Sequence, residues 1–161
     1  MGVTFTGLTT GPFIVPGRVT GDPTAVSPDN FFIVVKNPTT TPLQIRFFLD
    51  VCLEPETMKV EHFSTDMITI DADSCFTSPG PVNFPLAPRF VVRVSMIGDI
   101  RTKGELLEAE VVGFRTFDLM NEPTMFFRHH DLIPTNNIFV PEGLPVPSSS
   151  NSLWKKHSRT G

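Results

Sequence analysis

The sequence predicts an all-β protein: a single antiparallel β-sandwich or jelly roll with extended N- and C-terminal arms. Sixteen prolines oppose long helices, because proline lacks the N–H donor and clashes with the preceding helical turn. Several segments alternate apolar and polar residues as half-buried strands do. Turn-forming residues separate these segments at short intervals, which is typical of sandwiches and jelly rolls. The length of 161 residues, 40% of them hydrophobic, suits one domain with one core.

The composition divides the chain into three parts. Residues 1–28 are expected to form an extended N-terminal arm, residues 29–118 the β-sandwich core, and residues 119–161 an irregular C-terminal segment with short strands and a tail. Glycine and proline recur throughout the first part, so we expect it to contribute no long central strand. The sandwich is therefore expected to fold without this arm.

The strand pattern begins in the middle part. Residues 30–37, NFFIVVKN, form a near-continuous apolar run that predicts a strand covered on both faces. A turn containing Asn37 and Pro38 follows. Residues 43–52, LQIRFFLDVC, show the cleanest alternation and predict a half-buried strand.

Later segments predict further strands. Weak alternation indicates short strands at residues 58–63 and 67–71, and repeated prolines make residues 76–88 a long connection. Residues 89–99 and 105–117 are then expected to pair as partner strands across a turn. Helix is the alternative for the start of the second segment, since Glu, Leu and Ala are good helix formers. Its valines and the preceding Lys-Gly favour a strand.

The centre of the core is predicted from the inward positions of the segments 43–52 and 89–99. These positions are Leu43, Ile45, Phe47, Leu49, Val51, Phe90, Val92, Val94 and Met96. The opposite face of the first segment carries Phe48 among polar residues. Phe48 is expected either to anchor a partner or to lie beneath a tail.

Charge and hydropathy disfavour two classes of partner. The net charge is −4, and Lys155-Lys156 forms the basic run, so a nucleic-acid surface is not expected. No apolar stretch approaches the ~18–20 residues that span a bilayer. The N-terminus lacks the basic and apolar regions of a Sec signal peptide.

Motifs for catalysis are missing from the sequence. It contains no Gly-x-Ser-x-Gly elbow, phosphate loop or dinucleotide fingerprint. His129 and His130 are the one local cluster of metal-ligand types, and adjacent residues of an extended segment point to opposite sides. We therefore expect no enzyme, no cofactor and no metal site.

Cys52 and Cys75 are a candidate disulfide, within or between subunits. An internal bond would close a loop of about 24 residues, worth about 3 kcal/mol in the chain-entropy model. Two free thiols are the alternative.

The layout of residues 30–115 resembles a known class of β-sandwich protein. An apolar strand, a turn rich in Asn, Pro and Thr, an alternating strand, the turn LAP and then RVSMIGD follow one another. This layout is similar to subunits of endospore appendages and related spore-surface proteins of Gram-positive spore-forming bacteria. The resemblance implies a structural subunit. In endospore appendages an N-terminal connector carries cysteines that link stacked subunits; residues 1–28 contain no cysteine, so that linkage is not expected here.

Large apolar groups in the arms predict how such subunits assemble. They are Phe5, Phe13, Ile14, Val15, Phe139, Val140, Leu153 and Trp154. The arms fold back over their own sandwich or find cover on a neighbouring subunit by strand addition, and we expect the latter for at least one arm.

The sequence thus predicts a non-enzymatic subunit that self-assembles through its arms into a filament, coat or surface layer. Its expected partner is itself, and its expected location is the surface of a cell, spore or particle, reached without a Sec signal peptide. Alternatives remain open. One is a module that binds a partner on one sheet face, and another is a viral or phage jelly-roll structural protein. A metal-dependent jelly-roll enzyme is a further alternative, which elemental analysis without bound metal would remove.

Overall fold

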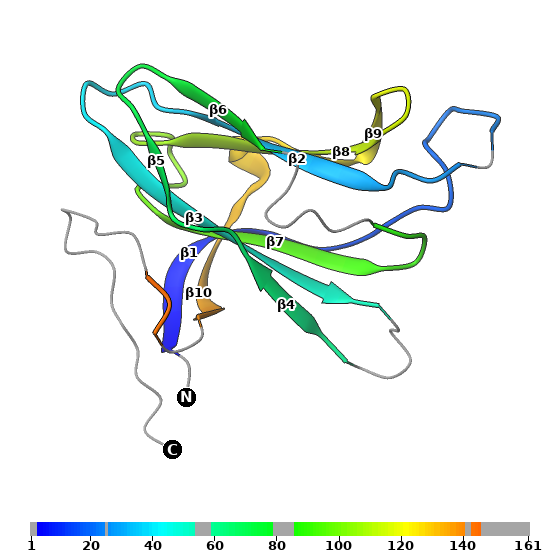
Figure 1. The fold of residues 1–161 in the computed structure, drawn as a ribbon, viewed down its shortest axis with the longest axis horizontal. Helices are drawn as coiled ribbons and strands as arrows, with labels where there is room; N and C mark the ends of the chain where they lie inside the picture. The colour runs from blue at the N-terminus through cyan, green and yellow to red at the C-terminus, as the bar shows by residue number, and fades with distance from the viewer. Residues whose placement is uncertain (1–2, 25, 54–58, 79–85, 141–142, 146–161) are drawn as a thin grey trace.

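The computed structural model describes residues 3–24, 26–53, 59–78, 86–140 and 143–145. These residues form strands and one 3-10 helix, with no α-helix among them (Figure 1), which confirms the all-β prediction. The elements are β1 (Val3–Ile14), β2 (Asn30–Lys36), β3 (Leu43–Cys52), β4 (Glu61–Ser64), β5 (Ile68–Ile70), β6 (Cys75–Ser78), β7 (Val91–Gly98), β8 (Glu108–Arg115), β9 (Met120–Phe127), η2 (His129–Asp131) and β10 (Ile133–Val140).

The strands form two antiparallel sheets. Sheet A has the order β10-β1-β7-β3-β4, and β5 also pairs with β3. Sheet B has the order β6-β2-β8-β9. Figure 1 shows the strands of sheet B above those of β3 and β7, so that the two sheets form the layers of a β-sandwich. The predicted sandwich is confirmed.

The main core lies between the two sheets. Every predicted core position except Phe90 is buried, and Phe90 is partly buried and packs against the same cluster. Sheet B contributes its own alternating positions: Phe31, Ile33, Val35, Ala109 and Val111. In β2 the residues between these are only half-buried, so the expected cover on both faces is present on one face only. Alternation therefore identified the inward face of the strands correctly.

The segments around residues 89–99 and 105–117 are strands, but they do not pair with each other. β7 lies between β1 and β3 in sheet A, whereas β8 lies between β2 and β9 in sheet B. The connection crosses from one sheet to the other, and the backbone N–H of Leu107 donates to the Asp99 carbonyl, 2.9 Å away. The expected pairing is wrong. Two strands in facing sheets each turn an apolar face to the shared core, and so do the two strands of a hairpin, so the same sequence pattern fits both arrangements.

The N-terminal segment is not an arm outside the sandwich. β1 pairs with β7 on one side and with β10 on the other, so it is an interior strand of sheet A. Glycine and proline fit into it because the pairing register shifts between Phe5 and Gly7 and again between Thr9 and Pro12. Bulges accommodate residues that a regular ladder excludes.

The C-terminal segment is more regular than expected. β9 and β10 are strands of eight residues each, and β10 forms one edge of sheet A. The predicted irregular segment therefore begins with two ordinary strands. Its tail, residues 146–161, lies outside the described residues.

A second, smaller core lies on the other face of sheet A. Phe48, Ile97, Ile138 and Val140 are buried together there, and Leu144 packs against them. Ile138 and Val140 belong to β10. The paired strands β1 and β10 therefore fold over the outer face of β3 and β7. Of the two roles expected for Phe48, the structure shows cover by the chain's own C-terminal strand rather than an open anchor.

Gly7 marks the place where β1 passes closest to β7. A Cβ at this position would lie 2.1 Å from the Met96 carbonyl oxygen and 2.6 Å from Cδ1 of Ile138. The first of these atoms is backbone and cannot move aside easily. Only glycine therefore lets β1 approach both neighbours at this point.

Substitution of Gly7 by alanine should destabilise the protein through this overlap. We expect Gly7→Ala to lower the free energy of unfolding by about 1–3 kcal/mol or more, because overpacking forces a backbone shift. Gly17→Ala is the matched control, since no atom lies within 4 Å of a Cβ at that position. Urea unfolding of both variants measures the difference, and equal losses would contradict the close passage.

Deletion of residues 1–14 should abolish the fold, contrary to the expectation for a dispensable arm. The deletion exposes the ladder edges of β7 and β10 and opens the second core, which β1 joins to the rest. Circular dichroism during heating measures the result. A cooperative β-sheet transition in the truncated chain would show that β1 is dispensable.

Candidate assembly surface

The chain itself covers part of the apolar set expected to mediate assembly. Val15 and Val140 are buried, in the main and the second core respectively. Phe13 packs against the main core, and its ring centroid lies 5.0 Å from that of Phe127. Val15 and Val140 are therefore already covered within their own chain in the described structure.

Other members of that set stay exposed or lie outside the description. Ile14 and Phe139 are 61% and 46% exposed. The backbone of Phe5 pairs with Ile138 within sheet A. Leu153 and Trp154 lie outside the described residues. Among the described candidates, Ile14 and Phe139 remain available to a partner.

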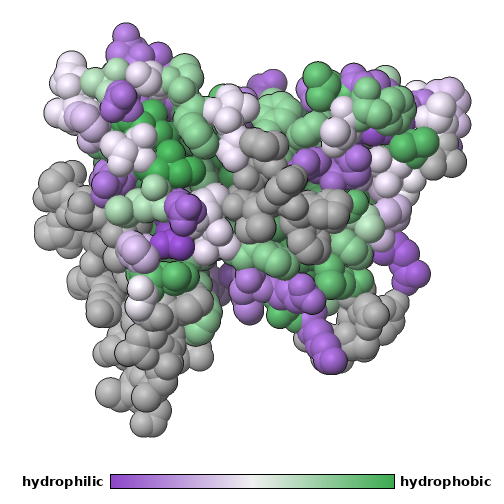
Figure 2. Space-filling view, viewed as in Figure 1, coloured by the Kyte–Doolittle hydropathy of each residue, from purple (hydrophilic) through white to green (hydrophobic). Residues whose placement is uncertain are grey.

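Among the residues that the structure describes, the most exposed neighbouring apolar side chains lie in the turn between β8 and β9 and at the start of β9, where the sequence predicted no site. Phe117 is 72% exposed, Leu119 is 68% exposed and Met120 is 43% exposed. We call these three residues the hairpin tip. Figure 2 shows green, hydrophobic side chains interspersed with purple, hydrophilic ones at the upper right, the end of the molecule where Figure 1 draws this turn. A clue was present in the sequence, because large apolar residues are unusual in a short turn.

A buried ion cluster supports the hairpin tip from below. Arg115 is almost fully buried, and its Nη2 lies 2.5 Å from Asp22 Oδ2 and 2.6 Å from Asp118 Oδ2. Its Nε also donates to Asp118 Oδ1 at 3.1 Å, which completes a forked pair with that carboxylate. The cluster joins the segment before β2 to both ends of the β8–β9 turn.

The same contacts shift the pKa values of the cluster. Hydrogen bonds from the backbone and side chain of Thr24, together with Arg115, lower the pKa of Asp22 to about 2. The hydrogen bond from Arg115 lowers the pKa of Asp118. The bonds to Asp118 and Asp22 raise the pKa of Arg115. All three groups are thus held in their charged forms.

The buried cluster also orients the exposed ring. The guanidinium carbon of Arg115 lies 4.6 Å from the centroid of the Phe117 ring, within the range of a cation–π contact. Because Asp22 and Asp118 fix the guanidinium, one face of the ring rests on a fixed support while the other faces solvent. The Phe117 ring of the apolar tip is therefore held in a fixed orientation with one face toward solvent.

A second buried carboxylate ties the N-terminal loop to β9. Glu122 accepts hydrogen bonds from the backbone N–H of Thr20 at 2.6 Å and from the Thr20 hydroxyl at 2.7 Å. The backbone and hydroxyl of Thr124 donate to the same carboxylate. Burial raises the pKa of Glu122, but these four hydrogen bonds outweigh it and leave the pKa lowered.

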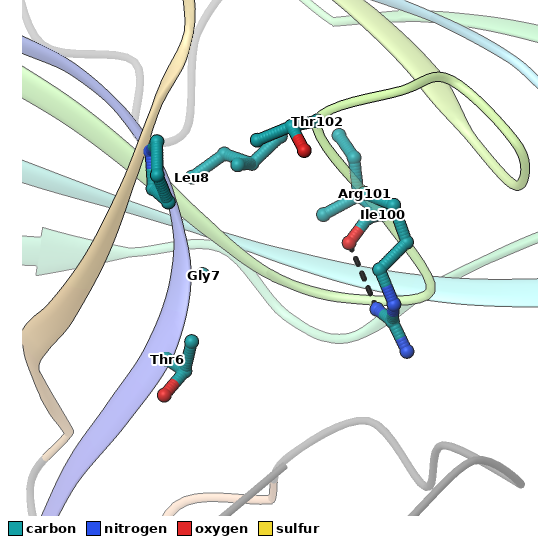
Figure 3. A pocket seen from close by; sticks show the side chains of 7 residues that line it. Thr6, Gly7, Leu8, Ile100, Arg101 and Thr102 are labelled. Atoms are coloured by element: carbon teal, nitrogen blue, oxygen red, sulfur yellow. Dashed lines mark hydrogen bonds between the residues drawn. The ribbon is translucent and has the colours of Figure 1, made fainter. Parts of the chain in front are cut away.

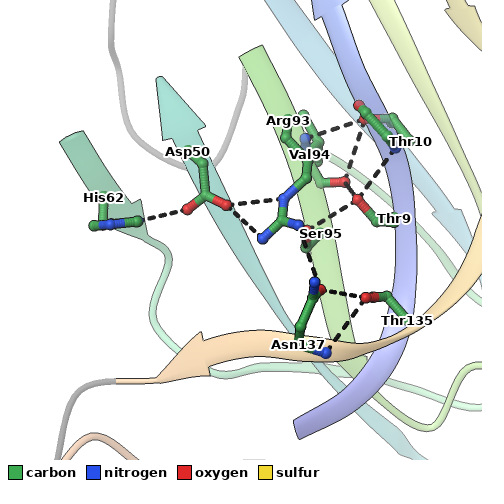
Figure 4. A network of polar contacts seen from close by, with 10 residues as sticks. Thr9, Thr10, Asp50, His62, Arg93, Val94, Ser95, Thr135 and Asn137 are labelled. Carbon is green, nitrogen blue, oxygen red and sulfur yellow. Dashed lines mark hydrogen bonds and ion pairs between the residues drawn. The ribbon is translucent and has the colours of Figure 1, made fainter. Parts of the chain in front are cut away.

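A polar network crosses the outer face of sheet A (Figure 4). His62 Nδ1 lies 2.7 Å from Asp50 Oδ1, and Arg93 Nε donates to Asp50 Oδ2 at 2.9 Å. Arg93 Nη1 also donates to Asn137 Oδ1 at 3.4 Å. The network thus connects β4, β3, β7 and β10, and helps to hold the curled β10 against the sheet.

A shallow hollow of about 330 Å³ adjoins this network. Its lining combines the ionic groups Asp50, His62 and Arg93 with apolar and thiol groups. Those are Pro12, Cys52, Val60, Val91 and Val92. We call it the outer groove.

The adjacent histidines serve separate structural roles. They lie in the 3-10 helix η2, whereas an extended segment was expected at this position. His129 Nδ1 accepts from the Ala109 N–H at 3.1 Å, and its Nε2 lies 2.5 Å from the Arg101 carbonyl oxygen, to which it donates. His130 is exposed. Over the described ranges, no group of three or more His, Cys, Asp and Glu side chains is placed to hold a metal ion.

Cys52 and Cys75 are free thiols in the structure. Cys52 is on the outer side of β3 in sheet A, and Cys75 pairs with Lys36 on the outer side of sheet B. Stacked sheets are about 10 Å apart, whereas a disulfide needs Cα atoms within about 7 Å. The described fold therefore does not bring the two thiols together within one chain, and a bond between subunits stays a prediction.

Acid should weaken the cluster beneath the tip. A carboxylate with a lowered folded pKa contributes stability above its unfolded pKa, and that stability is lost as the pH falls through the folded value. For Asp22 this window runs from 3.8 to about 2. The difference in unfolding free energy between wild type and Asp22→Asn should be largest above about pH 4 and shrink toward pH 2.

Thermal unfolding at a series of pH values measures this difference. Asp66→Asn is the control, since Asp66 is exposed, and it should follow the wild type throughout. A difference for Asp22→Asn that does not change between pH 6 and pH 2 would contradict the assignment.

The described part of the chain contains no helix with the length and apolar composition needed to cross a membrane. Comparisons with protein-family models, with curated proteins and with solved structures find no match to this chain.

Proposed function

We propose that this chain is a structural subunit without catalytic activity, which assembles with copies of itself into a filament, coat or surface layer. The observation that carries the proposal is the hairpin tip, whose exposed apolar groups rest on a buried ion cluster. Exposed apolar groups gathered in one place mark interaction sites more often than single exposed residues do. Rigid support lowers the entropy lost on association.

A protein partner fits this tip better than a lipid surface. The ion cluster beneath the tip holds two carboxylates, Asp22 and Asp118, against the one guanidinium of Arg115, so its net charge is negative. Membrane leaflets that attract proteins electrostatically are anionic and favour basic surroundings. The open edges of the sheets, including β10 with its exposed Phe139, add backbone donors and acceptors that a second copy could pair with.

A binding module is the second candidate function, and the outer groove favours it. Phe48, the anchor expected on this face, is buried, so the module would instead use Val60 together with His62 and Arg93, which both contact Asp50. Such a groove combines an apolar wall with a few polar groups, which is the usual make-up of a ligand site. It contributes no self-association by itself.

Light scattering over a wide concentration range separates the two functions. The wild type should exceed the monomer mass of 17.8 kDa with rising concentration, and negative-stain microscopy should show regular assemblies. The double variant Phe117→Ser/Leu119→Ser should stay monomeric, because it removes the apolar surface that drives association. Val60→Ser, in the outer groove, should assemble like the wild type.

Circular dichroism confirms that each variant is folded, so a loss of assembly is not a loss of structure. A wild type that remains monomeric at every concentration would overturn the proposal. Disruption by Val60→Ser alone would assign the contact to the outer groove.

A further inference from the structure

A small apolar pocket lies where the curled pair β1–β10 separates from the sandwich. Its volume is about 170 Å³. Figure 3 shows Thr6, Gly7 and Leu8 of β1 on one side and Ile100, Arg101 and Thr102 of the β7–β8 connection on the other. Pro134 of β10 completes the lining.

The walls of this pocket are held in place by contacts already described. On one wall, the buried Leu8 and the adjacent Gly7 belong to β1, which is hydrogen-bonded to β10 and β7. On the opposite wall, His129 donates to the Arg101 carbonyl, and Arg101 Nη1 donates to the Ile100 carbonyl at 2.9 Å. The pocket is therefore a preformed feature of the fold.

We propose that the pocket receives the hairpin tip of a second copy of this chain, with the Phe117 ring as the inserted group. This inference rests on the proposed function and names its contact. An apolar cavity of about 150 Å³ accommodates benzene, so a pocket of this size suits one phenyl ring. Arg101 lines the pocket, whereas the cluster beneath the ring holds two carboxylates, Asp22 and Asp118, against the one guanidinium of Arg115, so the two surfaces differ in the sign of their charge.

The positions of tip and pocket on the chain determine the form of the assembly. The β7–β8 connection precedes β8 and the hairpin tip follows it, so the two features lie at opposite ends of that strand (Figure 1). Eight residues of β-strand span about 26 Å. A contact between different patches at opposite ends is heterologous, and such contacts continue from copy to copy in filaments unless the rotation closes a ring.

Two variants that each lose one half of the contact test this directly. The tip variant is Phe117→Ser/Leu119→Ser, and the pocket variant is Thr102→Trp, which fills the pocket from its exposed rim. Each variant alone should remain at 17.8 kDa in light scattering. An equimolar mixture should form a one-to-one dimer of twice that mass, because one intact tip and one intact pocket remain. Thr77→Trp, at an exposed threonine of β6, is the matched control and should assemble as the wild type does.

Each other outcome overturns part of the proposal in a distinguishable way. A monomeric wild type overturns both the proposed function and the contact. Assembly by the pocket variant overturns the pocket alone and leaves self-assembly standing. If Thr102→Trp assembles and also has a lower melting temperature than Thr77→Trp, the occupant of the pocket is the chain's own C-terminal segment and not a second copy. Two monomeric variants that fail to combine would show that the tip and pocket do not meet.

Discussion

The close passage of β1 beneath the Met96 carbonyl is the constraint on which the rest of the molecule depends. Because Gly7 has no side chain, β1 can leave β7 and continue beside β10 without a gap. β1 therefore contributes Leu8 and Phe13 to the main core and pairs with β10, whose Ile138 and Val140 belong to the second core. The second core covers Phe48, and the pocket proposed to receive a neighbour opens at the same bend.

Buried charges position the parts of the chain that lack regular structure. The segment between β1 and β2 is rich in glycine and proline, yet Asp22 reaches Arg115 and Thr20 reaches Glu122. Each contact joins that segment to sheet B, where the β8–β9 turn emerges. A buried charge without a partner is energetically costly. The segment between β1 and β2 must therefore adopt the one conformation that brings these groups together. The contact with the fixed Arg115 guanidinium in turn orients the exposed Phe117 ring.

The sequence revealed which faces of the strands point inward, but not which strands are neighbours. Alternation in 43–52 correctly separated Phe47 from Phe48, since side chains alternate with a period of two in any strand. The same alternation carries no information about the partner strand, so β7 and β8 were expected to pair. Composition misjudged β1, because bulges at Gly7 and Pro12 tolerate residues that a regular ladder rejects. The candidate site consists of an apolar turn and an ion cluster whose members, such as Asp22 and Arg115, are far apart in the sequence. Neither feature produces a periodic pattern in the sequence.

The pairing of β1 with β10 has a consequence for synthesis on the ribosome. Val3 pairs with Val140, and Thr9 pairs with Ile133, so β1 meets its outer partner only after β10 has emerged from the ribosome. At about 5–20 residues per second, the intervening chain takes on the order of 6–25 seconds to translate. Throughout that interval the nascent chain carries an unpaired strand edge, which invites pairing with other chains. Nascent copies close together on one messenger RNA would therefore be able to exchange β1 before translation of either copy reaches β10.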